Sequence, residues 1–360
     1  MDEAVISLRN VSKSFGSVHA NENVSMDIYR GEILSLLGEN GSGKTTLMNM
    51  LSGIYYPDHG EIKVNGKAVN IRDPKDAFDC GIGMVHQHFK LVDVFSAAEN
   101  VVIGIKREHG LDLRGVAHDI KAICDKYGFV MDPNKKVYDM SVSEKQTLEI
   151  IKVIYRGADI LILDEPTAVL TPQETDKLFD VIRNMKKDGK TVIIITHKLH
   201  EVLAISDRVA ILRKGEYIDS IATKDADEER LTEMMVGEKV ELNIERPEIK
   251  DKKLRLKVSN LTCYNSDGLK VLDDVSFDAY GGEILGIAGV SGNGQKELLE
   301  SVAGLQNAMP GASVKYYSPN DENEHELISL TPRKIRQLGV HLSFVPEDRL
   351  GMGLVGSMGM

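Results

Sequence analysis

The octapeptide Gly38-Glu39-Asn40-Gly41-Ser42-Gly43-Lys44-Thr45 decides the fold that the sequence predicts. It matches the phosphate-binding P-loop pattern in full. The largely apolar run Glu32–Leu37 before it predicts a buried strand, and Lys44–Leu51 after it predicts a helix. In that context backbone N–H groups and the helix N-terminus face phosphates, Lys44 reaches the β- and γ-phosphates, and the Thr45 hydroxyl ligates Mg²⁺. The alternative, a glycine-rich turn with an incidental Lys-Thr pair, fits this context poorly.

A second glycine-rich loop, Gly289–Lys296, begins 251 residues after the first. The flanking sequence repeats at the same offset, since Gly31-Glu32-Ile33-Leu34 recurs as Gly282-Glu283-Ile284-Leu285 and Gly53 recurs as Gly304. A constant offset indicates a duplicated domain rather than chance glycines. The second loop has Gln295 in place of the lysine and Lys296 in place of the hydroxyl residue. We therefore expect one copy to keep the phosphate chemistry and the other to have lost it.

Composition limits the possible classes of protein. The 360 residues favour two or three domains, and 42% apolar with 28% charged residues is typical of a globular chain. The net charge of −11 shows no excess of basic residues of the kind that binds nucleic acid. The three cysteines, which contain no CxxC pair, indicate free thiols in a reducing compartment. The acidic N-terminus does not resemble a signal peptide, and no apolar run approaches the ~20 residues of a membrane helix. We expect a cytoplasmic chain that does not itself cross a membrane.

Two further apolar runs end in polar residues that suit a nucleotide site. Asp159–Leu163 is followed by Asp164 and Glu165, and Thr191–Thr196 is followed by His197. If these strands lie parallel to the first, their carboxyl ends meet at the phosphates. Asp164 would then hold Mg²⁺, Glu165 would polarise the attacking water, and His197 would sense the γ-phosphate. Taken alone, two acids after a strand are usually a solvated loop, and a single histidine is usually structural.

The order of these motifs resembles the nucleotide-binding domain of an ABC transporter ATPase. The motifs that carry the resemblance are the P-loop, Val85-His86-Gln87, Ser141–Gln146, Ile160–Glu165 and His197. The resemblance covers essentially the whole chain. Its most specific stretch, Arg156–Thr171, resembles fused double-domain ATPases serving bacterial importers of simple sugars and nucleosides. It implies an α/β P-loop NTPase fold with a β-subdomain and a helical subdomain, followed by a partial second copy.

The resemblance also assigns roles by position, with ATP and Mg²⁺ as the implied ligands. Phe15 stands where an aromatic ring stacks on adenine, and Gln87 stands in the loop that joins the magnesium site to the helical subdomain. The implied nucleotide-binding residues are Phe15, Gly38, Glu39, Asn40, Gly41, Ser42, Gly43, Lys44, Thr45 and Thr46. The implied metal ligands are Thr45, Gln87 and Asp164, and the implied catalytic residues are Glu165, His197 and Gln87. Residues Ala168–Thr171 would cross the dimer interface.

Two departures from the family pattern affect the expected mechanism. The family's signature motif, at the start of a helix, is usually Leu-Ser-Gly-Gly-Gln, and here it is Met140-Ser141-Val142-Ser143-Glu144. Side chains therefore replace both glycines, and a carboxylate stands near the expected place of the γ-phosphate. Because glycines let backbone approach a ligand and like charges repel, we expect a poor phosphate clamp. The second departure is Thr171, where an acid is common.

In ABC dimers each nucleotide lies between one P-loop and the other copy's signature, so the site pairing the two degenerate motifs is expected to be silent. The working site would pair Lys44, Asp164 and Glu165 with a second-copy signature. A purely structural second copy is the alternative.

The expected domain organisation is a first nucleotide-binding domain at 1–237, a solvated linker at 238–253 and the N-terminal part of a second, degenerate domain at 254–360. The segment Val345–Arg349 corresponds to Val85-His86-Gln87 in the first copy. We therefore expect a C-terminally incomplete piece of a protein of about 500 residues, able to bind ATP but hydrolysing it poorly by itself.

The leading functional hypothesis is the ATPase subunit of an ABC importer, a translocase peripheral to the cytoplasmic face of the cell membrane. Its expected partners are two integral-membrane permease subunits and an extracytoplasmic substrate-binding lipoprotein, with no nucleic acid. The resemblance favours nucleosides as the transported substrate, with a ribose- or galactose-type sugar next. One alternative is a soluble ABC-type ATPase that acts on ribosomes or DNA, which the acidic charge disfavours. A GTPase or small-molecule kinase is a third, but the chain has no guanine-reading Asn/Thr-Lys-x-Asp motif after a strand.

Overall fold

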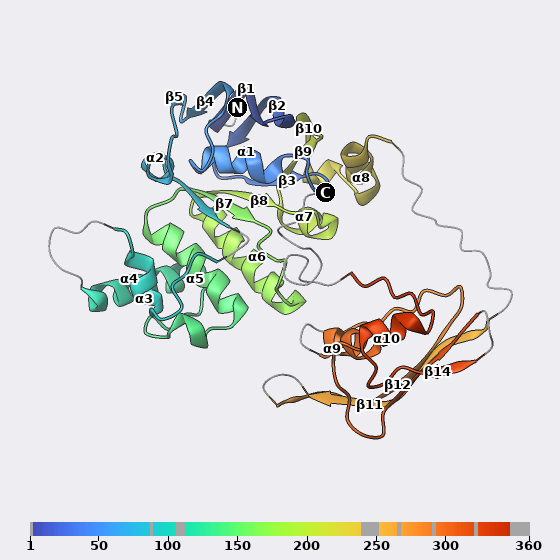
Figure 1. The fold of residues 1–360 in the computed structure, drawn as a ribbon. Helices are drawn as coiled ribbons and strands as arrows, with labels where there is room; N and C mark the ends of the chain where they lie inside the picture. Colours follow the sequence, from blue (N-terminus) through green and yellow to red (C-terminus); the bar gives the residue numbers. More distant parts are fainter. Residues whose placement is uncertain are drawn as a thin grey trace. The chain divides into compact units, whose positions relative to one another are not determined.

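The computed structural model describes residues 3–86, 89–105, 112–238, 252–264, 268–289, 293–319 and 323–345 (Figure 1). The chain forms two compact units, Met1–Leu242 and Asn243–Met360. Among the described residues, no helix is long and apolar enough to cross a membrane. Gln87, residues 239–251 of the expected linker, Val290–Gly292 and residues 346–360 lie outside the described residues.

A six-stranded sheet forms the centre of the first unit, in the order β10-β9-β3-β8-β7-β6. Its strands are β3 (Ile33–Leu37), β6 (Ile82–Val85), β7 (Ile160–Asp164), β8 (Thr191–Ile195), β9 (Arg208–Arg213) and β10 (Glu216–Ala222). All adjacent pairs except β9 and β10 are parallel. Every residue of β3, β7 and β8 is buried, as expected for parallel strands covered on both faces. The predicted parallel arrangement is therefore confirmed.

An antiparallel sheet in the order β2-β1-β4-β5 forms the β-subdomain. Its strands are β1 (Ala4–Phe15), β2 (Val18–Tyr29), β4 (His59–Val64) and β5 (Lys67–Val69). Helix α1 (Lys44–Leu51) contributes Leu47, Met48, Met50 and Leu51 to a core that also includes residues of both sheets. Helix α2 (Pro74–Asp79) begins at Asp73, whose carboxylate caps the first turn. The β-subdomain thus covers one face of the P-loop helix.

Helices cover the other face of the six-stranded sheet (Figure 1). Helix α6 (Pro172–Lys187) and the inner side of α5 (Val142–Tyr155) pack on the sheet. The outer side of α5 forms a separate core with α3 (Ala97–Val102) and α4 (Leu113–Tyr127), which is the expected helical subdomain. The remaining helical elements of the first unit are η1 (Val137–Asp139), α7 (Leu199–Ile205), η2 (Thr223–Asp225) and α8 (Glu228–Val236).

The second unit contains an antiparallel sheet in the order β12-β11-β13-β14. Its strands are β11 (Leu254–Tyr264), β12 (Lys270–Tyr280), β13 (Ser313–Tyr317) and β14 (Glu324–Glu326). One face of this sheet packs with α9 (Gln295–Val302) and α10 (Pro332–Gln337) around a core of its own. Within the described part of this unit, residues 283–289 and 341–345 form no strand.

Candidate active site

The P-loop connects the buried end of β3 to the first residue of α1. Gly43 precedes the helix with φ +94°, and a Cβ there would lie 2.2 Å from the carbonyl oxygen of Ala20. A Cβ on Gly38 would lie 2.2 Å from the carbonyl oxygen of Leu212. Both positions therefore require glycine, because β2 and β9 approach the loop backbone too closely for any side chain.

Lys44 lies at the first position of α1, where its ammonium bridges the loop. The Nζ atom donates to the carbonyl oxygens of Gly38 at 2.7 Å and Glu39 at 2.9 Å. The side chain is buried, and this burial lowers the pKa of Lys44, while the carboxylates of Glu165 and Asp164 oppose the shift. A fixed, desolvated cation next to exposed loop N–H groups suits the binding of a phosphate chain.

Asp164 ends β7 with its side chain buried beside Thr45. Burial, followed by the charge of Glu165, raises the pKa of Asp164 to about 6. The Thr45 hydroxyl donates to this carboxylate, and that hydrogen bond, together with the Lys44 charge, acts in the opposite direction. Mg²⁺ prefers oxygen ligands such as this hydroxyl and this carboxylate. It usually takes one or two ligands from the protein and the others from water and phosphate. The oxygens of Thr45 and Asp164 therefore fit a magnesium ion shared with a nucleotide.

The structure brings Glu165 and His197 together at the carboxyl ends of the neighbouring strands β7 and β8. His197 Nδ1 lies 2.9 Å from Glu165 Oε1, and the two side chains are 50% and 19% exposed. Glu165 has φ +47°, and its N–H donates to the carbonyl oxygen of Ile195 at 2.9 Å. The sequence placed both residues at the phosphates but did not predict that they bind each other. The available signal was that each directly follows one of two parallel strands.

Most of the predicted nucleotide-binding and catalytic residues line one cleft of about 430 Å³. Its lining contains Phe15, Asn40, Gly41, Gly43, Lys44, Thr45, Thr46, Asp164 and Glu165. Gly38, Glu39, Ser42 and His197 lie outside this lining. The first two bind the Lys44 ammonium through their carbonyls, Ser42 is buried within the loop, and His197 binds Glu165.

Phe15 lines the same cleft as the P-loop lysine. Its side chain is 43% exposed, so it does not belong to the buried core. The ring contacts Tyr55 edge to face, with centroids 5.0 Å apart, and the Lys13 ammonium lies 5.5 Å from the ring centroid. An exposed, braced aromatic ring is suited to stacking on a nucleotide base.

Strand β2 supplies residues that the sequence analysis missed. Val18, His19 and Ala20 line the cleft because the β1–β2 hairpin folds them beside Phe15. Asn21 is buried and donates from Nδ2 to the carbonyl oxygen of Gly43 at 3.3 Å, while its Oδ1 has no hydrogen-bond partner among the described residues. No feature of the sequence around Asn21 sets it apart from the other polar residues of β2.

The signature segment begins α5 with a complete capping box. Ser141 Oγ accepts from the Glu144 N–H at 3.2 Å, and Glu144 Oε2 accepts from the Ser141 N–H at 2.8 Å. The Glu144 carboxylate also binds the Lys135 ammonium at 2.7 and 2.8 Å, which lowers the pKa of Glu144. The Glu144 carboxylate, which is expected to repel a γ-phosphate, is thus paired with Lys135, and the expectation of a poor phosphate clamp stays a prediction. Val142 and Ser143 still place side chains where the family has glycines.

Thr171, the second departure from the family pattern, begins α6. Its hydroxyl accepts from the Glu174 N–H at 3.3 Å, and Glu174 Oε2 accepts from the Thr171 N–H at 2.9 Å. The preceding loop is held by Thr167, whose hydroxyl donates to buried Glu201 at 2.6 Å and whose carbonyl accepts from Lys198 at 3.0 Å. The threonine thus serves as the N-cap of α6.

Comparison with known proteins agrees with this geometry. The family described as ABC transporter matches residues 21–168. The chain is 43% identical to the nucleoside import ATP-binding protein NupA of Lactococcus lactis subsp. cremoris over 359 residues, which is 99% of this chain and 69% of that protein. It is 43% identical to the guanosine import ATP-binding protein NupO of Bacillus subtilis, covering 98% of this chain and 68% of that protein. It is 35% identical to the ribose import ATP-binding protein RbsA of Clostridium tetani, covering 99% and 69%.

Solved structures share the fold of the first unit. The dimeric bacterial ABC transporter cassette MJ0796 matches with a TM-score of 0.55 and 25% identity, covering 61% of this chain and 98% of that one. The ADP conformation of MJ1267, an ATP-binding cassette of an ABC transporter, matches with a TM-score of 0.57 and 23% identity, covering 65% and 95%. With its complete P-loop, its paired strand-end acids and these relatives, the chain belongs to the ATP-binding proteins of the ABC transporter family, and it is an ABC-type ATPase.

Proposed function

We propose that this chain hydrolyses ATP to energise the uptake of a nucleoside through partner permeases at the cytoplasmic face of a membrane. The observation that carries the proposal is the cleft in which Phe15, Lys44, Asp164 and Glu165 converge. The 43% identity to nucleoside and guanosine import proteins, against 40% to a glucose import protein and 35% to a ribose import protein, supports a nucleoside first and a sugar next.

Each residue of the cleft has a distinct part in the proposed reaction. Phe15 stacks on the adenine, and the loop N–H groups with the Lys44 ammonium bind the phosphates. Thr45 and Asp164 would hold Mg²⁺, which when bound neutralises phosphate charge. Glu165 accepts the proton of the attacking water, and His197 holds that carboxylate in place. Gln87, which lies outside the described residues, keeps its proposed role beside the metal and the water.

A groove of about 300 Å³ is the proposed contact with the permease partner. It lies between α2, β6 and the second half of α5, and it includes His86, Lys90 and Ile103. Buried Glu149 of α5 accepts from the Lys90 N–H at 2.6 Å, and Lys152 lies 3.2 Å from the same carboxylate. The segment on either side of Gln87 is thereby tied to the helix that carries the signature. This connection supports the transfer of movement between the nucleotide cleft and a membrane partner, which works with a substrate-binding protein outside the membrane.

We also propose that residues 254–360 are part of a second, degenerate nucleotide-binding domain, after a first domain at 1–237 and a linker at 238–253. The strand order β12-β11-β13-β14 parallels β2-β1-β4-β5. Helix α9 begins 251 residues after α1, and both follow a left-handed glycine, Gly294 with φ +90° and Gly43 with φ +94°. These parallels support a duplication of the domain.

The test is the uptake of labelled guanosine and labelled ribose by cells that express this chain with its neighbouring permeases. We expect guanosine uptake that is lost in the Glu165→Gln variant and kept in a Glu61→Gln variant, because Glu61 is an exposed residue of β4. Ribose uptake without guanosine uptake would move the proposal to a sugar. ATPase activity with no dependence on any permease would instead favour a soluble ABC-type ATPase.

A further inference from the structure

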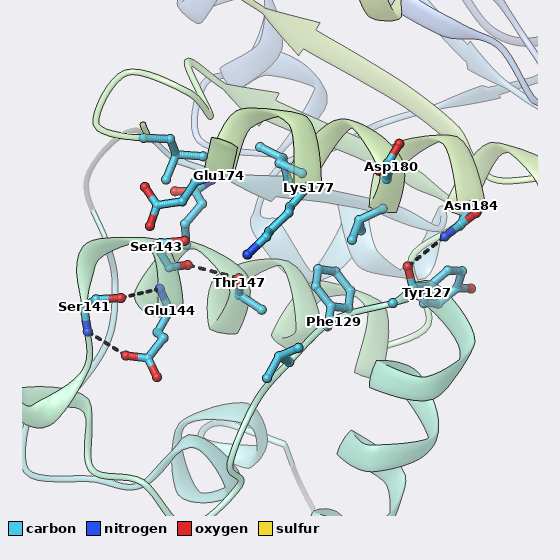
Figure 2. Close-up of a pocket in the computed structure, with 16 residues that line it drawn as sticks. Tyr127, Phe129, Ser141, Ser143, Glu144, Thr147, Glu174, Lys177, Asp180 and Asn184 are labelled. Atoms are coloured by element: carbon cyan, nitrogen blue, oxygen red, sulfur yellow. Dashed lines mark hydrogen bonds between the residues drawn. The ribbon is translucent and has the colours of Figure 1, made fainter. Parts of the chain in front are cut away.

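A second hollow of about 430 Å³ lies between the start of α5, the length of α6 and the loop that follows α4 (Figure 2). It shares no lining residue with the nucleotide cleft. Its volume is within the range of small-molecule sites. The apolar part of the lining consists of Phe129, Val130, Leu170, Leu178 and Val181.

The carboxylates in this lining are already neutralised or bonded. The pairs are Glu144 with Lys135 at 2.7 Å, Glu174 with the Thr171 hydroxyl at 2.9 Å, and Asp180 with Arg183 at 2.9 Å. Groups with partners of their own have little to offer a ligand, because binding one would break an existing bond. The acidic residues therefore do not make the hollow a cation site.

Lys177 is the cation of this lining, and its charge is one of the causes that lower the pKa of Glu174. Figure 2 shows its amine extending from α6 into the hollow toward Thr147 of α5. Among the described residues it forms no hydrogen bond or ion pair. The Thr147 hydroxyl donates its proton to the carbonyl oxygen of Ser143 at 3.0 Å, so its lone pairs are left for a further donor. Such an ammonium over an apolar floor is complementary to an anionic head on an apolar body.

We propose that this hollow binds a small organic anion, a carboxylate or a phosphate monoester with an aromatic or branched apolar body, through the Lys177 ammonium. The two walls belong to different layers, because α5 begins in the helical subdomain and α6 covers the six-stranded sheet. The bound anion would join these layers next to Thr171, six residues after Glu165. The lining shares no residue with the cleft of the first P-loop, although it includes Ser141, Ser143 and Glu144 of the signature, and it adjoins the segment that carries the proposed catalytic carboxylate.

Titration of the purified full chain with naphthoate, naphthyl phosphate and neutral naphthamide, followed by ligand-observed NMR, tests the site. We expect saturable binding of at least one of the two anions, and binding of the amide about tenfold weaker or less, because a charge-assisted hydrogen bond is lost. The tighter of the two anions identifies the head group. ATP at saturation should leave the binding unchanged.

Variants in α6 separate the proposed contact from general effects. Lys177→Gln should weaken anion binding about tenfold or more, and Lys177→Arg should retain it. Lys187→Gln is the matched control, since Lys187 lies in the same helix outside the lining. Lys177 is exposed and glutamine is a good helix former, so melting temperatures should stay equal. Equal affinity in Lys177→Gln, displacement by ATP, or no saturable binding of either anion would each overturn the proposal.

Discussion

In the first unit the residues after Gly31 form β3, all of which is buried, whereas the residues after Gly282 form no strand among the described residues of the second unit. Leu34 is 0% exposed, and its counterpart Leu285 is 44% exposed, although both follow the same Gly-Glu-Ile sequence. The difference lies in the neighbours, because β3 pairs with β8 and β9, which come from residues 191–213. A parallel strand therefore depends on distant partners, and the local sequence does not build it alone.

The two glycine loops differ in the charge of the residue that begins the following helix, which is Lys44 in the first unit and Gln295 in the second. Lys44 bridges the carbonyls of Gly38 and Glu39, which holds a cation at the loop. In the second unit a Cβ on Gly289 would lie 2.2 Å from Gln295 Nε2, so the glutamine amide packs against the first glycine of its loop. The amide thus lies beside the first glycine of its loop, as the Lys44 ammonium does in the first loop, but it carries no charge.

If the first unit holds the only competent acid, Glu165→Gln should abolish nearly all ATP hydrolysis by the assembled protein. The amide cannot accept the water's proton, so we expect a loss on the order of 10²–10⁴ in kcat with ATP still bound. Phosphate release and ATP binding measured on the same sample check this. Substantial remaining turnover would mean that the second unit also hydrolyses ATP, and that the two units do not differ in the way proposed.

Truncation of the paired leucines should separate the two units by stability. Leu34→Ala should lower the free energy of unfolding of the first unit by about 2–5 kcal/mol, because it opens a cavity in a fully buried strand. Leu285→Ala should change stability by about 0.5 kcal/mol or less, as is usual for exposed positions. Hydrogen exchange during urea titration reports on each unit separately. A large loss in Leu285→Ala would show that this segment is packed in solution.

The paired P-loop positions should differ in nucleotide affinity. Lys44→Ala should weaken ATP binding by about 1.5–3 kcal/mol, since it removes a charge-assisted contact to phosphate. Gln295→Ala should leave the affinity unchanged, which isothermal titration of both variants checks. The double change Gln295→Lys with Lys296→Thr should not restore a Lys44→Ala protein. Restoration would show that the second loop is a nucleotide site waiting only for its side chains.

The smallest expected effect concerns the base. Phe15→Ala should weaken ATP binding by about 1–3 kcal/mol, the range of base–aromatic stacking, and should change the melting temperature little because the ring is 43% exposed. Tyr56→Ala, at a 51% exposed aromatic outside the cleft, is the control. A loss of thermal stability with unchanged affinity would assign Phe15 to packing instead.

Local chemistry explains what the sequence could predict. The run Lys44–Leu51 forms α1 as predicted, because strand, loop and helix are encoded in consecutive residues. Lys44, Thr45 and Asp164 were identified by type and position in the same way. The contacts of Glu144 with Lys135 and of Glu165 with His197 were not predicted, because each joins residues that only the folded chain brings together. The pairing of Glu144 with Lys135 could not be predicted, because the type and position of a residue do not reveal its neighbour in the fold.

The backbone at Glu165 has a consequence for how this protein can change. A residue with a side chain at φ +47° costs on the order of 1 kcal/mol relative to glycine, and the proposed hydrolysis needs this carboxylate beside His197 in spite of that cost. Glycine at position 165 would relieve the cost and remove the carboxylate in one step. Laboratory selection of this chain for heat resistance alone would therefore enrich inactive proteins, and a selection that requires turnover would hold the strained residue in place.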